Sequence, residues 1–169
     1  QGDLSRLESQ FNVPFELGPK DLFDLPEHFG SRQKEPVDLS QYSIEILAEI
    51  NHAPRMTDQE IVSLAEHYRI SGADVIDLGC IPGESWRRVA DVTKLLVDRG
   101  LRVSIDSFDR TEVEAAVKGG AELVLSCNQS NIDWASQLDA ELVAIPEAPF
   151  ELDSLEQTVQ QLTDCGASF

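Results

Sequence analysis

Basic residues are scarce in this 169-residue sequence, where 13 Lys and Arg stand against 31 Asp and Glu and leave a formal charge of −18. Nucleic acid and anionic membrane surfaces would repel such a chain at long range, so the charge disfavours both as partners. A small molecule that is neutral, or whose charge is matched locally, is the better candidate for a ligand.

Cysteines and long apolar runs are also few. Cys80, Cys127 and Cys165 are an odd number without a C-x-x-C motif, which argues against a disulfide framework or a structural zinc site and predicts free core thiols. No run approaches the roughly 18 apolar residues of a membrane span, and the N-terminus lacks the pattern of a signal peptide. We therefore expect a cytoplasmic protein, and its 41% hydrophobic residues suffice for a core.

The chain changes character near residue 44. Residues 1–43 hold half of the eight prolines and no sustained apolar period, which predicts an irregular lead segment with short helices at 4–10 and 21–28. From residue 44 onward, β-rich runs alternate with helical stretches of about ten to sixteen residues. The predicted strands are 44–50, 74–79, 102–107, 123–127 and 142–145. This alternation predicts an α/β fold with a parallel sheet.

Helix boundaries carry their own signals. Capping-box spacing occurs at Thr57 with Glu60, at Asp109 with Glu112 and at Asp153 with Glu156, and each pair predicts a helix start. Glycines at 72, 100, 119–120 and 166 follow helical stretches, as expected where the chain leaves a helix through a left-handed residue.

The number of βα units indicates a partial barrel. Five units occupy 44–165, residues 167–169 resemble the start of a sixth strand, and a full eight-unit barrel needs about 250 residues. We therefore expect part of a (β/α)8 TIM barrel, in a chain cut at both ends. The alternative is a complete doubly wound open sheet, but the sequence has no G-x-G-x-x-G or Walker motif.

Polar residues end the predicted strands, where α/β proteins carry their sites. They are Asn51 and His52, Asp77, Asp106 and Ser107, Ser126 and Asn128, and Glu147. Carboxylates and amides together complement a flat heterocycle with adjacent N–H and NH₂ donors. The alternative is structural, in which these side chains cap helices or fix loops.

Four segments resemble the pterin-binding family of dihydropteroate synthases and pterin-binding methyltransferases, in order and spacing: residues 72–79, 81–85, 104–107 and 120–128. Together with 18–22 and 24–27, they make the chain most similar to dihydropteroate synthase-related proteins of organisms that use tetrahydromethanopterin. Those proteins carry an additional N-terminal domain. The resemblance implies that 1–43 is the tail of that domain with its linker, and that 44–169 is the N-terminal part of a pterin-binding barrel.

The resemblance also implies residue roles. Asp106 and Asn128 match residues that line the pterin ring, and Asp77 lies in a stretch that contacts or supports the pocket. Asn51 matches an Asn that helps bind Mg²⁺ and the diphosphate of the activated pterin. A homodimer is a family tendency.

Charge distribution and position add further candidates. Eight of the 13 basic residues lie within 44–110, which makes Arg55, Arg87, Arg88 and Arg110 candidates for a diphosphate, with solvated surface positions as the alternative. His52 is a candidate acid/base next to Asn51, with a structural role as its alternative.

The chain also departs from a synthase. The long first loop of the family is absent, because residues 51–57 lead almost directly into a predicted helix. The family's later Asp, Lys and Arg-x-His would lie beyond Phe169, so we expect this chain alone to lack a complete synthase site. Three hypotheses remain: a transferase of tetrahydromethanopterin or folate biosynthesis that joins a pterin diphosphate to an arylamine, a one-carbon methyltransferase with a corrinoid partner, and a non-catalytic pterin-binding scaffold.

Overall fold

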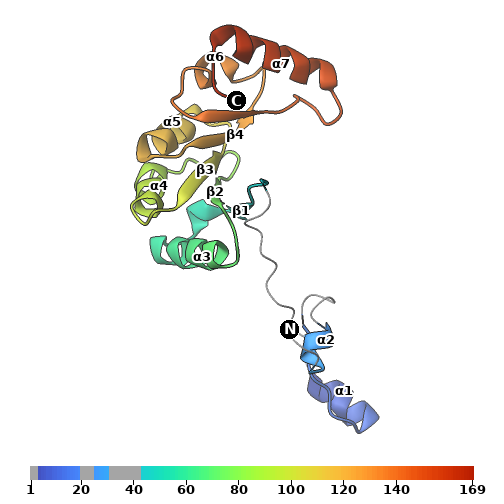
Figure 1. The fold of residues 1–169 in the computed structure, drawn as a ribbon. Coiled ribbons are helices and arrows are strands. Elements are labelled where there is room, and N and C mark those ends of the chain that lie inside the picture. The colour runs from blue at the N-terminus through green and yellow to red at the C-terminus, as the bar shows by residue number, and fades with distance from the viewer. Residues whose placement is uncertain (1–3, 20–24, 31–42) are drawn as a thin grey trace. The chain divides into compact units, whose positions relative to one another are not determined.

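The structure, a computed structural model, describes residues 4–19, 25–30 and 43–169. It divides into two compact units, residues 1–41 and residues 42–169. The first unit contains helix α1 (Leu4–Phe11) and the short helix α2 (Leu25–His28), drawn in blue in Figure 1. The helix predicted at 4–10 is therefore confirmed. Part of the helix predicted at 21–28 lies outside the described residues. That 1–43 is the tail of a preceding domain stays a prediction.

The second unit alternates strands and helices throughout. Its first half holds β1 (Leu47–Ile50), the short 3-10 helix η2 (Ala53–Arg55), α3 (Asp58–Ile70), β2 (Val75–Gly79) and α4 (Val89–Val97). Its second half holds β3 (Arg102–Asp106), α5 (Arg110–Gly119), β4 (Leu123–Cys127), α6 (Ile132–Ala135), β5 (Glu141–Ala144) and α7 (Leu152–Cys165).

The sheet has the topology of a barrel. Its five strands are all parallel and follow the chain in the order β1-β2-β3-β4-β5. A doubly wound sheet would reverse its strand order at a switch point, so this alternative is wrong. Within the described residues β1 and β5 are edge strands, and the sheet is not closed. The predicted partial α/β barrel is confirmed.

The end of the chain turns back toward the sheet. Gly166 ends α7 in the left-handed region at φ 68°, and the Leu142 backbone N–H of β5 then donates to the Ser168 carbonyl at 3.0 Å. This bond places residue 168 alongside β5, where a sixth strand was predicted, although residues 167–169 have no strand assignment.

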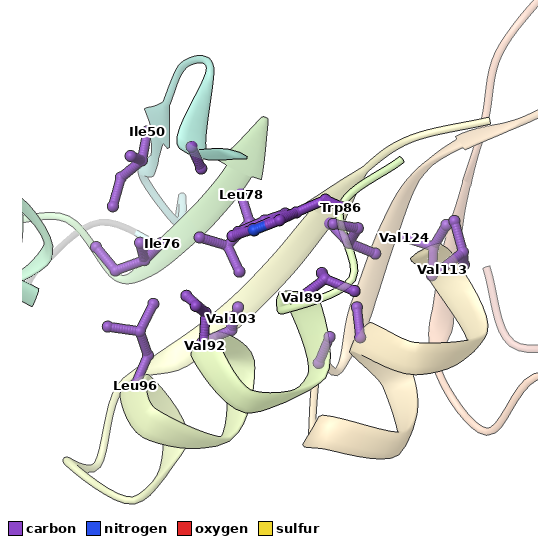
Figure 2. Packing of buried hydrophobic residues seen from close by; sticks show 14 of the residues in the cluster. Ile50, Ile76, Leu78, Trp86, Val89, Val92, Leu96, Val103, Val113 and Val124 are labelled. Carbon is purple, nitrogen blue, oxygen red and sulfur yellow. The ribbon is translucent and has the colours of Figure 1, made fainter. Parts of the chain in front are cut away.

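The core lies between the sheet and the helices. Helices α3, α4 and α5 lie along one face of the sheet (Figure 1). Figure 2 shows the strand residues Ile76, Leu78 and Val103 pointing toward Val89, Val92 and Leu96 of α4, with Trp86 beside them. Because strand side chains alternate between faces, the residues between these apolar ones point the other way. This opposite side, which we call the inner face, carries Glu49, Asp77, Gly79, Ser104 and Asp106.

The helix caps follow the sequence only in part. Thr57 and Glu60 form a complete capping box at the start of α3. Asp109 caps α5 by accepting from the backbone of Thr111 and Glu112, but the Glu112 side chain turns into the interior, so the predicted box there is half formed. The third predicted box is wrong, because α7 begins at Leu152 and has no side-chain cap.

Three other expectations need correction. β1 begins at Leu47 rather than residue 44, and α6 has only four residues where a helix of ten or more was predicted. Cys165 is exposed at the end of α7, while Cys127 is buried and Cys80 is half-buried, so only part of the core-thiol prediction holds. All three cysteines are free.

None of the helices in the described part of the chain combines the length and the apolar content that crossing a membrane requires.

Candidate functional site

Asp77 is a buried carboxyl group on the β2 strand of the inner face, with 3% of its surface exposed. Its Oδ1 accepts a hydrogen bond from Ser104 Oγ at 2.7 Å on the neighbouring strand. Burial raises the pKa of Asp77 to about 6, and the negative charges of Asp106 and Glu49 act in the same direction against the hydrogen bond from Ser104. The inner face therefore holds a carboxyl group whose charge changes in the mildly acidic range.

Asp106 ends β3 and lines a pocket. Its Oδ1 accepts from Ser126 Oγ of β4, and its carbonyl accepts from the Cys80 backbone N–H at 3.2 Å. The second carboxylate oxygen has no hydrogen-bond partner among the described residues. The pocket has a volume of about 430 Å³ and is formed by the segments that follow β2 and β3. Its lining comprises Asp106 with Cys80, Ile81, Pro82, Gly83, Glu84, Ser85, Ser107, Phe108, Asp109 and Glu112.

Glu112 is a buried residue of the pocket lining that connects the two loops of the pocket. It is only 3% exposed, and its two carboxylate oxygens accept from the Trp86 backbone N–H at 2.7 Å and from Ser107 Oγ at 2.6 Å. The carboxylate thus joins the loop after β2 to the loop after β3. Burial, with the nearby charge of Glu112, raises the pKa of the Cys80 thiol. Cys80 therefore stays a neutral thiol and is a poor nucleophile.

Asn128 follows β4 and is fixed by a tight turn. It is 7% exposed, and its Oδ1 accepts from the Ser130 backbone N–H at 2.9 Å and from Ser130 Oγ at 2.6 Å. Asn131 Oδ1 accepts from the Asn128 backbone N–H at 2.9 Å, and Asn131 Nδ2 donates to the Ser126 carbonyl at 2.6 Å. The amide Nδ2 of Asn128 has no partner among the described residues. Because Ser126 reaches Asp106, Asn128 lies at the same edge of the sheet as Asp106.

Asn51 and His52 follow β1 and are both exposed. His52 has a left-handed backbone, with φ 56°, directly before η2. Arg55 forms an ion pair with Glu84 at 2.7 Å and so joins the loop after β1 to the loop after β2. All three residues follow the carboxyl end of β1, and the ion pair places Arg55 beside Glu84 of the pocket lining.

The other basic candidates are mostly paired. Arg88 pairs with Asp58, and Arg110 pairs with Glu114 at 2.6 Å on the surface of α5. Arg87 is exposed and makes no ion pair among the described residues. Of the four arginines named from the sequence, Arg55, Arg88 and Arg110 each have an ion-pair partner among the described residues, and Arg87 has none there.

No group of three or more His, Cys, Asp or Glu side chains in the described ranges has the geometry of a metal site. Asn51 supplies one amide oxygen, whereas a resident Mg²⁺ needs several oxygen ligands. The residues present do not make a metal centre by themselves.

The sequence did not reveal several residues of this site. Ser104 and Ser126 hold the two aspartates, Glu112 holds the loops, and Glu49 shares the inner face with Asp77. One signal was available, because Glu49 is an acidic residue inside an apolar strand, two positions before Asn51. The other contacts depend on strand register, which the sequence does not give.

Comparison of this chain with known proteins finds a relative in sequence and solved structures with a similar fold. No family model matches the chain. An uncharacterized protein of Methanocaldococcus jannaschii is 27% identical over 142 residues, which cover 75% of this chain and 27% of that protein. The chain thus spans about a quarter of the length of this relative.

Solved structures of dihydropteroate synthases match the described fold. The enzyme of Burkholderia cenocepacia, in complex with 7,8-dihydropteroate, gives a TM-score of 0.58 at 21% identity, covering 75% of this chain and 56% of the enzyme. The Coxiella burnetii enzyme with pteroic acid gives 0.59 at 16% identity, covering 75% and 59%. The Yersinia pestis enzyme with a pterine-sulfa conjugate gives 0.60 at 14%, covering 73% and 55%. The chain therefore has the fold of the dihydropteroate synthases, over a little more than half the length of those enzymes.

Proposed function

We propose that this chain is the N-terminal part of a pterin-binding barrel and that the pterin ring binds at the carboxyl ends of β2, β3 and β4. The observation that carries the proposal is the meeting of Asp106 and Asn128 at one sheet edge, each with an unused hydrogen-bonding atom. Solved proteins with this fold hold 7,8-dihydropteroate and pteroic acid.

The free atoms match the edge of a pterin. The second Asp106 oxygen accepts from ring N–H or the 2-amino group, and Asn128 Nδ2 donates to a ring nitrogen or the carbonyl oxygen. Ser126 and Ser130 fix the two side chains in place, so little rotamer freedom is lost on binding. Asp77 lies on the neighbouring strand β2, and its raised pKa lets this carboxyl group gain or lose a proton when a ligand binds.

The reaction proposed for the whole protein is the condensation of a pterin diphosphate with an arylamine, in folate or tetrahydromethanopterin biosynthesis in the cytoplasm. Asn51 and Arg55 lie at the end of β1 and would face the diphosphate, with Mg²⁺ arriving on the substrate rather than in a resident site. The chemistry is mainly positioning and charge neutralisation, since the diphosphate leaves and the amine attacks the methylene carbon. His52 is the candidate acid/base beside the reacting carbon.

The second candidate is a pterin-dependent methyltransferase that works with a corrinoid protein. The connection after β1 favours it, because only seven residues, 51–57, separate β1 from α3, and five of them, 52–56, form η2 and its caps. So short a connection leaves no long loop to close over a diphosphate. A pterin-binding scaffold without chemistry fits the same observation.

A titration separates these candidates. Full-length protein is titrated with 7,8-dihydropterin and with its 6-hydroxymethyl diphosphate, each with and without Mg²⁺, by isothermal titration calorimetry. A synthase binds the diphosphate more tightly, and only with Mg²⁺. Equal affinities that do not depend on Mg²⁺ would refute the synthase reading, and methyl exchange with added cobalamin would then support the methyltransferase. Failure to bind any pterin would refute the proposed site.

A further inference from the structure

Strand β4 carries one extra residue just before its end. Val124 stands level with Leu142 of β5, and three residues further along β4, Cys127 stands level with Ala144, which is only two residues further along β5. This irregularity is a β-bulge, which shifts the alternation of side chains along the strand that contains it. Because Leu142 and Ala144 share one face of β5, Val124 and Cys127 share one face of β4. Both belong to the hydrophobic core.

The bulge brings the end of β4 into the site. Because Cys127 points to the core, its neighbours Ser126 and Asn128 point to the inner face. Ser126 Oγ accordingly donates a hydrogen bond to Asp106 Oδ1. In a regular strand, Ser126 would share the face of Val124 and point away from Asp106. Both proposed pterin ligands therefore depend on the bulged end of β4, Asn128 directly and Asp106 through Ser126.

The side chain of Asn131 holds the backbone of this bulged end. The Cys127 carbonyl accepts from the Ile145 N–H at 2.8 Å, so the backbone groups of the residues on either side of Cys127 point to the edge opposite β5. There, Asn131 Nδ2 donates to the Ser126 carbonyl at 2.6 Å, and Asn131 Oδ1 accepts from the Asn128 N–H at 2.9 Å.

These two bonds imitate a strand. A residue of a neighbouring parallel strand likewise donates to one carbonyl and accepts from the N–H two residues further along. The Asn131 amide takes this place beyond the point where the pairing of β3 with β4 ends. Asn131 is only 4% exposed, so water does not compete for its bonds, and its effect on a ligand passes through the residues that it holds.

We infer that Asn131 is a positioning residue of the pterin site, whose amide fixes the bulged end of β4 and thereby sets both Asp106 and Asn128. The inference rests on the proposed function, because these two residues are the pterin ligands assigned there. Without the amide, a buried carbonyl and a buried N–H lose their partners and the strand end relaxes. Ser126 then moves away from Asp106, and the Asn128 backbone loses its anchor.

Titration of full-length protein with 7,8-dihydropterin, by isothermal titration calorimetry, measures the effect. Asn131→Ala should raise the dissociation constant by about tenfold, because two ligating side chains lose their positions. Asn131→Asp is the second variant, for the case that Asn131→Ala does not fold. It keeps the size of the side chain and its acceptor for the Asn128 N–H, but places an oxygen against the Ser126 carbonyl, and should also weaken binding.

Thr158→Val is the matched control. Thr158 Oγ1 is buried on α7 and accepts from Gln129 Nε2 at 2.9 Å, so the substitution breaks a hydrogen bond of the same loop while both bonds of the Asn131 amide remain. This variant should bind 7,8-dihydropterin like wild type. Equal weakening by Thr158→Val and Asn131→Ala would overturn the inference, because any disturbance of the loop would then have the same effect.

A double-mutant cycle separates positioning from a general loss of structure. Because Asn131 acts partly through Asp106, Asp106→Asn should raise the dissociation constant by a smaller factor in the Asn131→Ala background than in wild type. The Asn131→Asp background takes its place if Asn131→Ala does not fold. A merely structural role of Asn131 would lower the folded fraction and leave this factor unchanged, which would overturn the inference.

The remaining outcomes keep the two claims apart. Wild-type affinity in the Asn131 variants, with 7,8-dihydropterin bound, overturns the role of Asn131 and leaves the pterin site intact. A wild type that binds no pterin overturns the proposed function, and the inference falls with it. Weaker binding by the Asn131 variants, together with wild-type affinity in Thr158→Val and a smaller factor for Asp106→Asn, supports the inference.

Discussion

Replacing Asp77 by asparagine should stabilise the protein above neutral pH and leave its stability near pH 4 unchanged. Asp77 is almost fully buried, and burial raises its pKa from 3.8 to about 6. At a pH well below 3.8 the side chain is protonated in both the folded and the unfolded chain, and near pH 4 it is only partly ionised in the unfolded chain, so it costs little stability there. Above pH 3.8 the unfolded chain loses this proton more readily than the folded protein does, so the free energy of unfolding falls as pH rises. Above about pH 6 the folded protein also holds a buried negative charge, and the loss of stability is then complete.

The magnitude follows from the two pKa values. The difference between 3.8 and about 6 corresponds to about 3 kcal/mol at pH 8, on the scale of about 1.4 kcal/mol for each tenfold change. Asparagine has nearly the same shape, keeps an oxygen that can accept from Ser104 Oγ and carries no charge. The free energy of unfolding of Asp77→Asn should therefore exceed that of wild type by up to about 3 kcal/mol at pH 8, and by close to zero at pH 4.

Urea unfolding of the full-length protein, followed by tryptophan fluorescence between pH 4 and pH 8, measures this difference. Asp91→Asn, an exposed position on α4, is the matched control and should change the free energy of unfolding by less than about 0.5 kcal/mol throughout. A difference between Asp77→Asn and wild type that is the same at pH 4 and pH 8 would refute the reasoning, because it would show that Asp77 has the same pKa in the folded and unfolded states.

Three further substitutions test the framework of the site by urea unfolding. Glu112→Ala should lower the free energy of unfolding by about 3 kcal/mol, because it leaves two buried donors without their acceptor; a loss below about 1 kcal/mol would show that those donors find other partners. Thr57→Ala removes the cap of α3 and should cost about 1 kcal/mol, whereas Thr57→Ser should cost much less. Gly119→Ala would bring a Cβ within 2.6 Å of the Ala90 carbonyl on α4 and should cost about 1–3 kcal/mol; a neutral result would mean that α4 and α5 can move apart at this point.

The sequence predicted the barrel-type alternation because each strand and helix is marked by local signals. Apolar periodicity fixed the strands near their observed positions, and the glycines at 72, 100, 120 and 166 all adopt positive φ where a helix ends. Prediction failed where a tertiary contact outweighed the local signal. Glu112 leaves the predicted capping box for two buried hydrogen bonds, which are stronger than a bond made at an exposed helix end.

The site was predictable to the extent that it lies at strand ends. Asp77, Asp106 and Asn128 were named from their positions, and the structure places them along one edge and face of the sheet. Glu49 was missed because its place beside Asp77 on the inner face comes from the register of β1 with β2. That register cannot be read from the order of residues along the chain.

The affinity of the full-length protein for 7,8-dihydropterin, with Asp106 intact and replaced by asparagine, tests the central claim most directly. Isothermal titration calorimetry should show binding by wild type and a dissociation constant at least about tenfold higher for Asp106→Asn, since a charged acceptor of a ring N–H becomes a neutral amide. Asp91→Asn should bind like wild type. Equal affinity of wild type and Asp106→Asn, or no binding by wild type, would contradict a pterin site at the end of β3.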